Sequence, residues 1–155
     1  MHDLAQGQPA PDFTLPRDGG GTQTLSDLRG GPVVLFFYPK DNTPGCTKEA
    51  VAFTGLLEDF AASGATVLGI SKDSVKKHDN FVAKHDLKVA LLSDAEADVC
   101  ETYGVWGEKK MYGKTFEGIT RTTVLIDAEG RIARVWPKVK VDGHAEEVLE
   151  AVRAL

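Results

Sequence analysis

The sequence has little cysteine and no long apolar run. Two cysteines in 155 residues are too few for a disulfide scaffold. No stretch of about 18 apolar residues occurs, so no membrane-spanning helix is predicted. The N-terminal stretch MHDLAQGQPAPDF lacks the basic start and apolar run of a secretory signal. We therefore expect a cytoplasmic protein in a reducing compartment, without a membrane partner.

The sequence also lacks a strong charge of one sign. Its 18 Lys and Arg residues face 23 Asp and Glu residues, giving a net charge of −5 without a basic cluster. This balance argues against nucleic acid as a partner. The 42% of hydrophobic residues allow a substantial core, and no repeat, linker or low-complexity segment divides the chain. We expect a single domain over residues 1–155.

Several cofactor and metal motifs are absent as well. No glycine cluster has the Lys-Ser/Thr ending of a phosphate loop. Zinc sites need paired ligands, and neither Cys46 nor Cys100 has a second Cys or His within four residues. A thioredoxin-type CxxC needs cysteine where Glu49 stands, and a phosphatase-type C-x5-R loop needs arginine where Ala52 stands. We therefore expect no metal and no cofactor.

The most informative stretch that is present runs from residue 33 to 54. Val33–Tyr38 is an unbroken apolar and aromatic run, which predicts a strand buried on both faces, and Pro39 ends it. Thr43 can cap a following helix with its hydroxyl, and Pro44 suits the first helical position. Cys46 then lies in the first turn, where unpaired N–H groups and the helix dipole favour thiolate over thiol.

Free cysteines are often small core residues, so this alternative must be weighed for Cys46. The apolar stripe predicted for its helix lies downstream, at Phe53, Leu56, Leu57 and Phe60. Cys46 is therefore predicted to belong to a functional site. A cysteine hydrolase would need a histidine base, but no histidine is a marked candidate and all are expected on solvated surfaces. The histidines are His2, His78, His85 and His144.

The rest of the chain predicts strands alternating with helices. The expected strands are 13–15 and 22–25, which form a hairpin, 66–70, 89–92, 122–126 and 131–136. The expected helices are 44–63, 74–85 and 144–155, with a short helix capped by Asp94, on which Ala95, Val99 and Tyr103 share a face. Such alternation implies parallel pairing through crossovers. We predict an α/β fold with a mixed central sheet and helices on both faces.

Residues 104–118 contain four glycines and no sustained period, which predicts a long loop. Two interpretations of its large side chains stay open. They either shield the site from water or pin the loop to the core. These side chains are Trp106, Met111, Tyr112 and Phe116.

Pro39, Thr43 and Cys46 form the pattern PxxxTxxC, which resembles the active-site signature of peroxiredoxins. The stretch FFYPKDNTPGCTKEA is similar to the bacterioferritin comigratory protein group, also called peroxiredoxin Q. Further similar segments are LGISKD at 68–73, LLSD at 91–94, and the stretches 103–119 and 121–132, so nearly the whole chain is covered. The resemblance implies a thioredoxin-like fold and a thiol-dependent peroxidase acting on hydrogen peroxide and organic hydroperoxides.

The resemblance also implies roles for individual residues. Cys46 is the nucleophile and becomes a sulfenic acid. Thr43 and the backbone N–H groups of Gly45 and Cys46 bind the peroxide, while Pro39 shields the sulfur. Arg121 matches the arginine that peroxiredoxins set against the thiolate. The alternative for Arg121 is a surface ion pair. The alternative for the whole protein is a binding or holdase module that keeps the fold without catalysis.

The sequence departs from the group at the resolving cysteine. Many members carry it five residues after the nucleophile, where Val51 stands, and others carry it on the next helix, where residues 74–85 contain none. Cys100 is the remaining thiol, and its apolar neighbours favour a structural role, with resolution as the alternative. We expect a one-cysteine cycle in a monomer, with an external thiol reductant such as thioredoxin or glutaredoxin.

Overall fold

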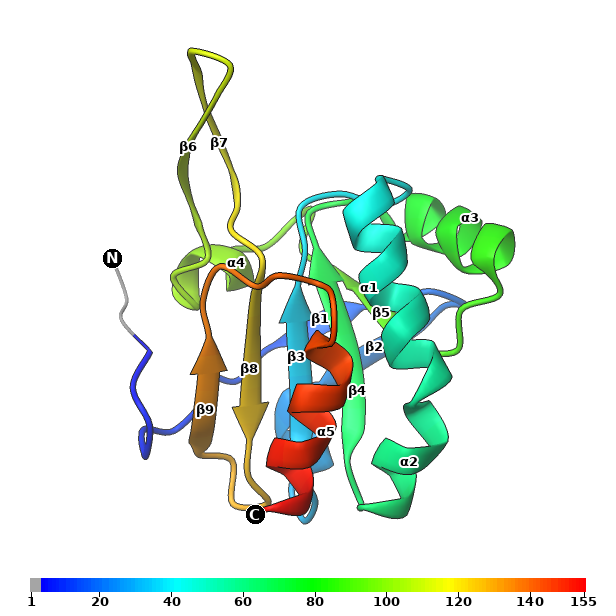
Figure 1. The fold of residues 1–155 in the computed structure, drawn as a ribbon, viewed down its shortest axis with the longest axis vertical. Helices are drawn as coiled ribbons and strands as arrows, with labels where there is room; N and C mark the ends of the chain where they lie inside the picture. The colour runs from blue at the N-terminus through cyan, green and yellow to red at the C-terminus, as the bar shows by residue number, and fades with distance from the viewer. Residues whose placement is uncertain (1–3) are drawn as a thin grey trace.

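A computed structural model describes residues 4–155 and places a five-stranded sheet at the centre of the molecule (Figure 1). In spatial order the strands are β5 (Ala90–Ser93), β4 (Thr66–Ser71), β3 (Val33–Phe37), β8 (Thr122–Ile126) and β9 (Ile132–Trp136). β3, β4 and β5 run parallel, whereas β8 and β9 are antiparallel to their neighbours. The predicted core strands and mixed sheet are thus confirmed. His2 lies outside the described residues.

Helices cover both faces of this sheet, as the sequence predicts. One face carries α1 (Pro44–Gly55), α2 (Leu57–Ala62), α3 (Val75–His85) and α5 (His144–Arg153). The other carries α4 (Val99–Thr102) and the 3-10 helix η1 (Leu25–Leu28), with the predicted N-terminal hairpin of β1 (Thr14–Pro16) and β2 (Thr22–Thr24). Among residues 4–155, every helix is too short or too polar to cross a membrane.

The central strand β3 divides the core into two apolar clusters. Its side chains alternate between the faces of the sheet. Val34 and Phe36 join the cluster beneath α1 and α5, and Val33, Leu35 and Phe37 join the cluster beneath α4. All five are buried, and each contributes roughly 1.5–3 kcal/mol of transfer free energy. The strand that leads to the loop before α1 is therefore fixed from both sides.

The first helix is shorter than predicted. It ends at Gly55, and α2 starts separately at Leu57, instead of one helix continuing to Ser63. At the break, the N–H of Leu56 turns back to the carbonyl of Phe53. Glycine within a helix costs about 1 kcal/mol relative to alanine, which accounts for the interruption at this position.

Residues 104–118 do not form the predicted long loop. They contribute most of a hairpin of β6 (Trp106–Met111) and β7 (Lys114–Ile119), which projects from the body (Figure 1). Its two-residue turn is Tyr112-Gly113, with positive φ at both positions. Met111 and Tyr112 are exposed, so they neither shield a site nor pin the segment to the core.

The short helix α4 differs from the prediction at its start. Its N-cap position is Asp98, and Ala95 lies exposed before the helix. The carboxylate of Asp94 nevertheless caps this helix, because it accepts hydrogen bonds from the N–H groups of Val99 at 3.1 Å and Cys100 at 2.8 Å. The helix N-terminus is therefore satisfied by an acidic side chain.

Candidate active site

The site forms where β3 ends and α1 begins. Pro39 stops the strand, and α1 starts at Pro44 after Thr43, whose extended backbone (φ −88°, ψ 152°) marks the N-cap. The prediction that the Thr43 hydroxyl caps the helix is wrong. Its Oγ1 donates instead to the carbonyl oxygen of Lys40 at 2.8 Å, and no side chain caps α1. The N–H groups of the first turn of α1 therefore have no hydrogen bond to a capping side chain.

Cys46 is the third residue of α1 and is 1% exposed. The prediction that it lies apart from the apolar stripe of its helix is also wrong. The buried residues of α1 begin at Cys46 and continue through Glu49, Ala50 and Phe53, at the three- and four-residue spacing of one helix face. The sulfur is therefore desolvated as well as close to the helix N-terminus.

Arg121 reaches this sulfur from a distant part of the chain. It immediately precedes β8, whose first residue Thr122 pairs with Phe37 at the end of β3. Nη2 of Arg121 donates to Cys46 Sγ at 3.3 Å, and the backbone carbonyl of Arg121 accepts from Val139 N–H at 2.9 Å. A Cβ at Gly45 would lie 3.2 Å from Nη2, so glycine leaves room for the guanidinium.

Glu49 is a site residue that the sequence analysis missed. Its Oε1 accepts from Nη1 of Arg121 at 2.7 Å, and its Oε2 has no hydrogen-bond partner among residues 4–155. Burial raises the pKa of Glu49 from 4.5 to about 7, against the opposing effect of Arg121. The pKa of Arg121 is raised by the Glu49 and Cys46 charges, which outweigh its burial. The spacing of three residues from Cys46 was the available signal.

Cys100 lies on the opposite face of the sheet from Cys46. The two belong to the separate clusters that β3 divides, and both are free thiols. Burial, followed by the charge of Asp94, raises the pKa of Cys100 far above its ordinary value. The apolar position predicted for Cys100 is confirmed, and its surroundings oppose thiolate formation.

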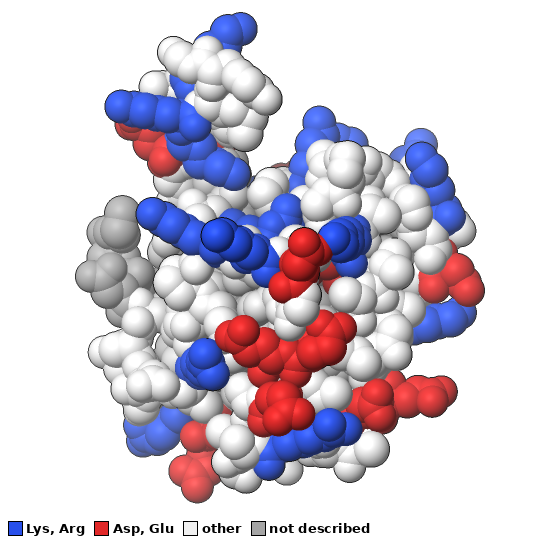
Figure 2. Space-filling view, in the orientation of Figure 1, with Lys and Arg blue, Asp and Glu red and all other residues white. Residues whose placement is uncertain are grey.

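Pro39 is half-buried at the edge of a groove beside the site. Trp106, Phe116, Ile119 and Lys109 of the β6–β7 hairpin also line this groove. Of the large side chains in the hairpin, Trp106 and Phe116 thus face the groove that Pro39 also lines. On the face seen in Figure 2, Lys and Arg side chains are frequent on the β6–β7 hairpin and over the end of the molecule where β3 leads to α1, whereas acidic side chains gather over α5. The surface near the thiol is therefore the more basic one.

The described histidines do not all lie on solvated surfaces, which corrects a further prediction. His78 is completely buried on α3, and His144 is 6% exposed at the start of α5. His144 contacts Thr123 Oγ1 at 2.8 Å, and burial lowers its pKa. The partners of His78 lie in the loop between Pro39 and Thr43 and on β5.

Comparison with known proteins gives consistent matches. The AhpC/TSA family profile matches residues 6–135. A candidate peroxiredoxin Bcp of Coxiella burnetii is 57% identical over 143 residues, 92% of this chain and 95% of that protein. A PrxQ mutant structure from Xylella fastidiosa has a TM-score of 0.93 at 43% identity, covering 99% of this chain and 98% of that one. The Xanthomonas campestris bacterioferritin comigratory protein, solved in a study of its alkyl peroxide reduction, has a TM-score of 0.89 at 45% identity, covering 98% of each chain.

Proposed function

The chain belongs to the AhpC/TSA family, as a peroxiredoxin of the Bcp group, and from this we propose a one-cysteine thiol peroxidase cycle centred on Cys46. Peroxiredoxins are thiol peroxidases, which consume a hydroperoxide and a thiol reductant. The observation that carries the proposal is the Arg121 guanidinium 3.3 Å from Cys46 Sγ, with the other thiol on the far face of the sheet.

The thiolate of Cys46 attacks the terminal oxygen of the hydroperoxide. The S–O bond forms as the O–O bond breaks, and the leaving oxygen takes a proton to give water or an alcohol. Sulfur is oxidised to sulfenic acid, and the peroxide is reduced. The charge of Arg121 does not vary with pH in the working range, so it favours the thiolate throughout.

Thr43 and the helix N-terminus bind the peroxide in this proposal. The proton of the Thr43 hydroxyl is committed to the Lys40 carbonyl, so its lone pairs accept the hydrogen bond of the hydroperoxide O–H. The N–H groups of Gly45 and Cys46 donate to the peroxide oxygens as charge develops on them. Pro39, half-buried next to the loop, limits the access of water to the sulfur.

The cycle closes with an external thiol, such as thioredoxin or glutaredoxin. Cys46 is 1% exposed, so a protein reductant reaches the sulfenic acid only when the first turn of α1 opens. A disulfide needs Cα atoms about 4.4–6.8 Å apart, which Cys100 attains only by leaving its cluster and passing the sheet. We place this activity in a cytoplasmic monomer with one domain.

A single-turnover experiment tests the cycle. One equivalent of hydrogen peroxide, with no other thiol present, should leave a sulfenic acid on Cys46 that a dimedone-type reagent traps. Intact-mass analysis should then show one trapped adduct, absent in Cys46→Ser. Loss of the mass of two hydrogens after oxidation, absent in Cys100→Ser, would establish a two-cysteine cycle instead.

A further inference from the structure

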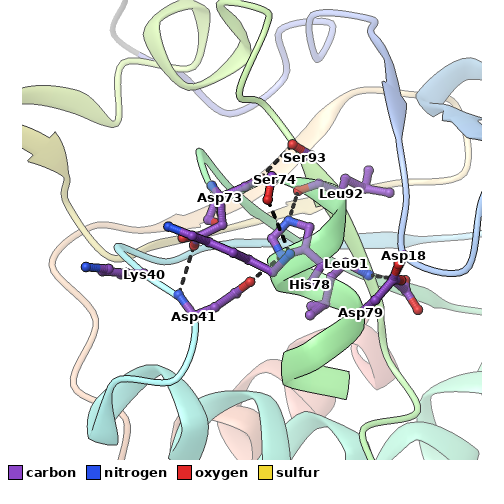
Figure 3. Close-up of polar contacts among 12 residues, drawn as sticks. Asp18, Lys40, Asp41, Asp73, Ser74, His78, Asp79, Leu91, Leu92 and Ser93 are labelled. Atoms are coloured by element: carbon purple, nitrogen blue, oxygen red, sulfur yellow. Dashed lines mark hydrogen bonds and ion pairs between the residues drawn. The ribbon is translucent and has the colours of Figure 1, made fainter. Parts of the chain in front are cut away.

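His78 is a buried imidazole between two hydrogen-bond acceptors (Figure 3). Nδ1 lies 2.6 Å from Oδ2 of Asp41, and Nε2 lies 2.9 Å from the carbonyl oxygen of Leu92 on β5. A neutral imidazole carries a proton on one nitrogen only, whereas a carboxylate and a carbonyl both require a donor. A doubly protonated ring satisfies both acceptors and forms a buried ion pair with Asp41.

Asp41 lies in the middle of the loop that connects β3 to α1. Its Oδ1 accepts from the hydroxyl of Tyr38 at 2.6 Å, and its N–H donates to Oδ2 of Asp73 at 2.8 Å. On one side of Asp41 the loop begins at Pro39, and on the other it ends at Thr43. Pro39 and Thr43, the two proposed peroxide-site residues, thus each lie two positions from Asp41, whose carboxylate is anchored by hydrogen bonds.

The contacts of Asp73 extend the network to the neighbouring strands. Ser71 at the end of β4 donates to Oδ2 of Asp73 at 2.7 Å, and Ser93 at the end of β5 donates to the carbonyl of Asp73 at 2.6 Å. All four groups, including Asp41, are buried. Buried polar networks that are fully paired hold their members in one arrangement.

We propose that His78 is a positioning residue for the peroxide site, because its imidazolium holds Asp41 and so fixes the loop from Pro39 to Thr43 against the ends of β4 and β5. This inference rests on the proposed function. His78 acts through Asp41 and touches neither sulfur nor peroxide. Displacement of a binding group by about 1 Å can slow an enzyme by roughly a hundredfold, so loop placement is expected to control the rate.

The charged groups around His78 predict the pH range of this effect. Tyr38 faces it from the residue after β3, Asp41 from the loop and Asp73 from the turn after β4. Asp79 on α3 instead accepts from the Gly19 N–H. Burial lowers the pKa of His78, but Asp41, the Leu92 carbonyl and Asp73 raise it above 6.5 overall. Burial and Asp41 raise the pKa of Tyr38 well above 10, so Tyr38 stays neutral.

The ion pair is therefore complete below the ordinary histidine pKa and is lost as the pH rises through the raised value. Loop order, and the reaction rate of Cys46 with peroxide, should fall over the same alkaline range. A role confined to overall stability would make the free energy of unfolding follow the titration of His78 and would leave the rate of the folded protein unchanged.

Two matched substitutions test the proposal. In His78→Asn the amide nitrogen occupies the place of Nδ1 and still donates to Asp41, whereas in His78→Gln it reaches the place of Nε2 and donates only to Leu92. His78→Gln should lower the rate constant of Cys46 with hydrogen peroxide by roughly tenfold or more. His78→Asn should keep most of that rate and lose the alkaline limb. Equal losses in both variants that follow their unfolding midpoints would overturn the proposal.

Two further readouts do not depend on peroxidase activity. Histidine ring ¹⁵N NMR should show both nitrogens of His78 protonated at pH 6, and hydrogen exchange at residues 39–43 should be faster in His78→Gln than in His78→Asn. A singly protonated ring or equal exchange refutes the positioning role. A wild-type protein that passes both tests yet fails to consume peroxide would refute the proposed function alone.

Discussion

The two cysteines occupy similar positions in the chain but different chemical surroundings. Each lies in the first turn of a helix, Cys46 in α1 and Cys100 in α4, and each is almost fully buried. In α4 the carboxylate of Asp94 accepts from two first-turn N–H groups, one of them that of Cys100 itself. In α1 no side chain caps the helix, and a guanidinium contacts the sulfur.

The difference shows that a helix N-terminus does not by itself activate a thiol. The positive end of the dipole near Cys100 is already neutralised by a negative charge, and burial then favours the neutral thiol. Near Cys46 no side chain neutralises the dipole, which in the proposed cycle acts on the sulfur and the peroxide. In the proposed cycle, this difference separates the two cysteines: a carboxylate caps the first turn at Cys100, the proposed structural residue, and no side chain caps it at Cys46, the proposed nucleophile.

The largest expected effect comes from exchanging each sulfur for oxygen. Cys46→Ser should abolish peroxide consumption, because the hydroxyl is a poor nucleophile toward the O–O bond. Cys100→Ser should retain most turnover when dithiothreitol is supplied as the reductant. Peroxide consumption assays on both variants measure this. Comparable losses in the two would break the distinction between the cysteines.

Removing the guanidinium should have the next largest effect. Arg121→Met deletes a charge-assisted hydrogen bond to the thiolate, worth about 1.5–3 kcal/mol, so peroxide reduction should slow roughly tenfold to a hundredfold. Iodoacetamide alkylation of Cys46 at pH 7 provides a second readout. The variant also strands the Glu49 carboxylate, so the double variant Arg121→Met/Glu49→Gln is the control. Alkylation and reduction at wild-type rates in either variant would remove Arg121 from the mechanism.

A smaller, pH-dependent effect is expected at Glu49. Its folded-state pKa of about 7 exceeds the ordinary 4.5, so the folded protein retains a proton that the unfolded chain releases, and stability falls as the pH rises between these values. Glu49→Gln keeps an acceptor for Arg121 but cannot titrate. Urea unfolding from pH 4.5 to 8 should show a flatter stability profile in the variant. The rate of Cys46 alkylation in the wild type should change near pH 7, where Glu49 titrates, and this change should be absent in Glu49→Gln. Unfolding and alkylation profiles that run parallel in the two proteins would contradict the raised pKa of Glu49.

The smallest effect sharpens the structural role of Cys100. Cys100→Ala leaves a small cavity in the cluster beneath α4 and should destabilise the fold by about 1 kcal/mol without slowing peroxide reduction. Denaturant unfolding and a peroxide assay on the same preparation measure the two quantities. A loss of activity with unchanged stability would reverse the role assigned to this thiol.

The strand, loop and helix around Cys46 could be predicted because their signals are local. An apolar run, a proline that ends it and a Thr-Pro pair all lie within a short segment. The partner of Cys46 could not be predicted in this way, because Arg121 is 75 residues away and only the family resemblance pointed to it. Glu49 was missed although its spacing of three residues from Cys46 is local, because a glutamate is seldom buried and its charged partner Arg121 lies far along the chain.

Other misses have different physical causes. The β6–β7 hairpin escaped prediction because Gly107 and Gly118 interrupt the alternation of its strands, and Tyr112 adopts a positive φ that tyrosine seldom takes. His78 looked solvated on a polar helix. It lies three residues before Phe81, which is also buried. This helical spacing from an apolar residue was the available sign that His78 faces the core.

The antiparallel pairing of β3 with β8 also bears on how the protein is made. Val33 pairs with Ile126 and Phe37 with Thr122, so these contacts join distant parts of the chain. Long-range pairings close late in folding, because chain entropy must be lost before they form. During synthesis the ribosome makes Cys46 75 residues before Arg121. In the proposed cycle, a nascent or partly folded chain therefore carries Cys46 without its guanidinium partner, and we expect the sensitivity of this thiol to oxidants to rise when the sheet is completed.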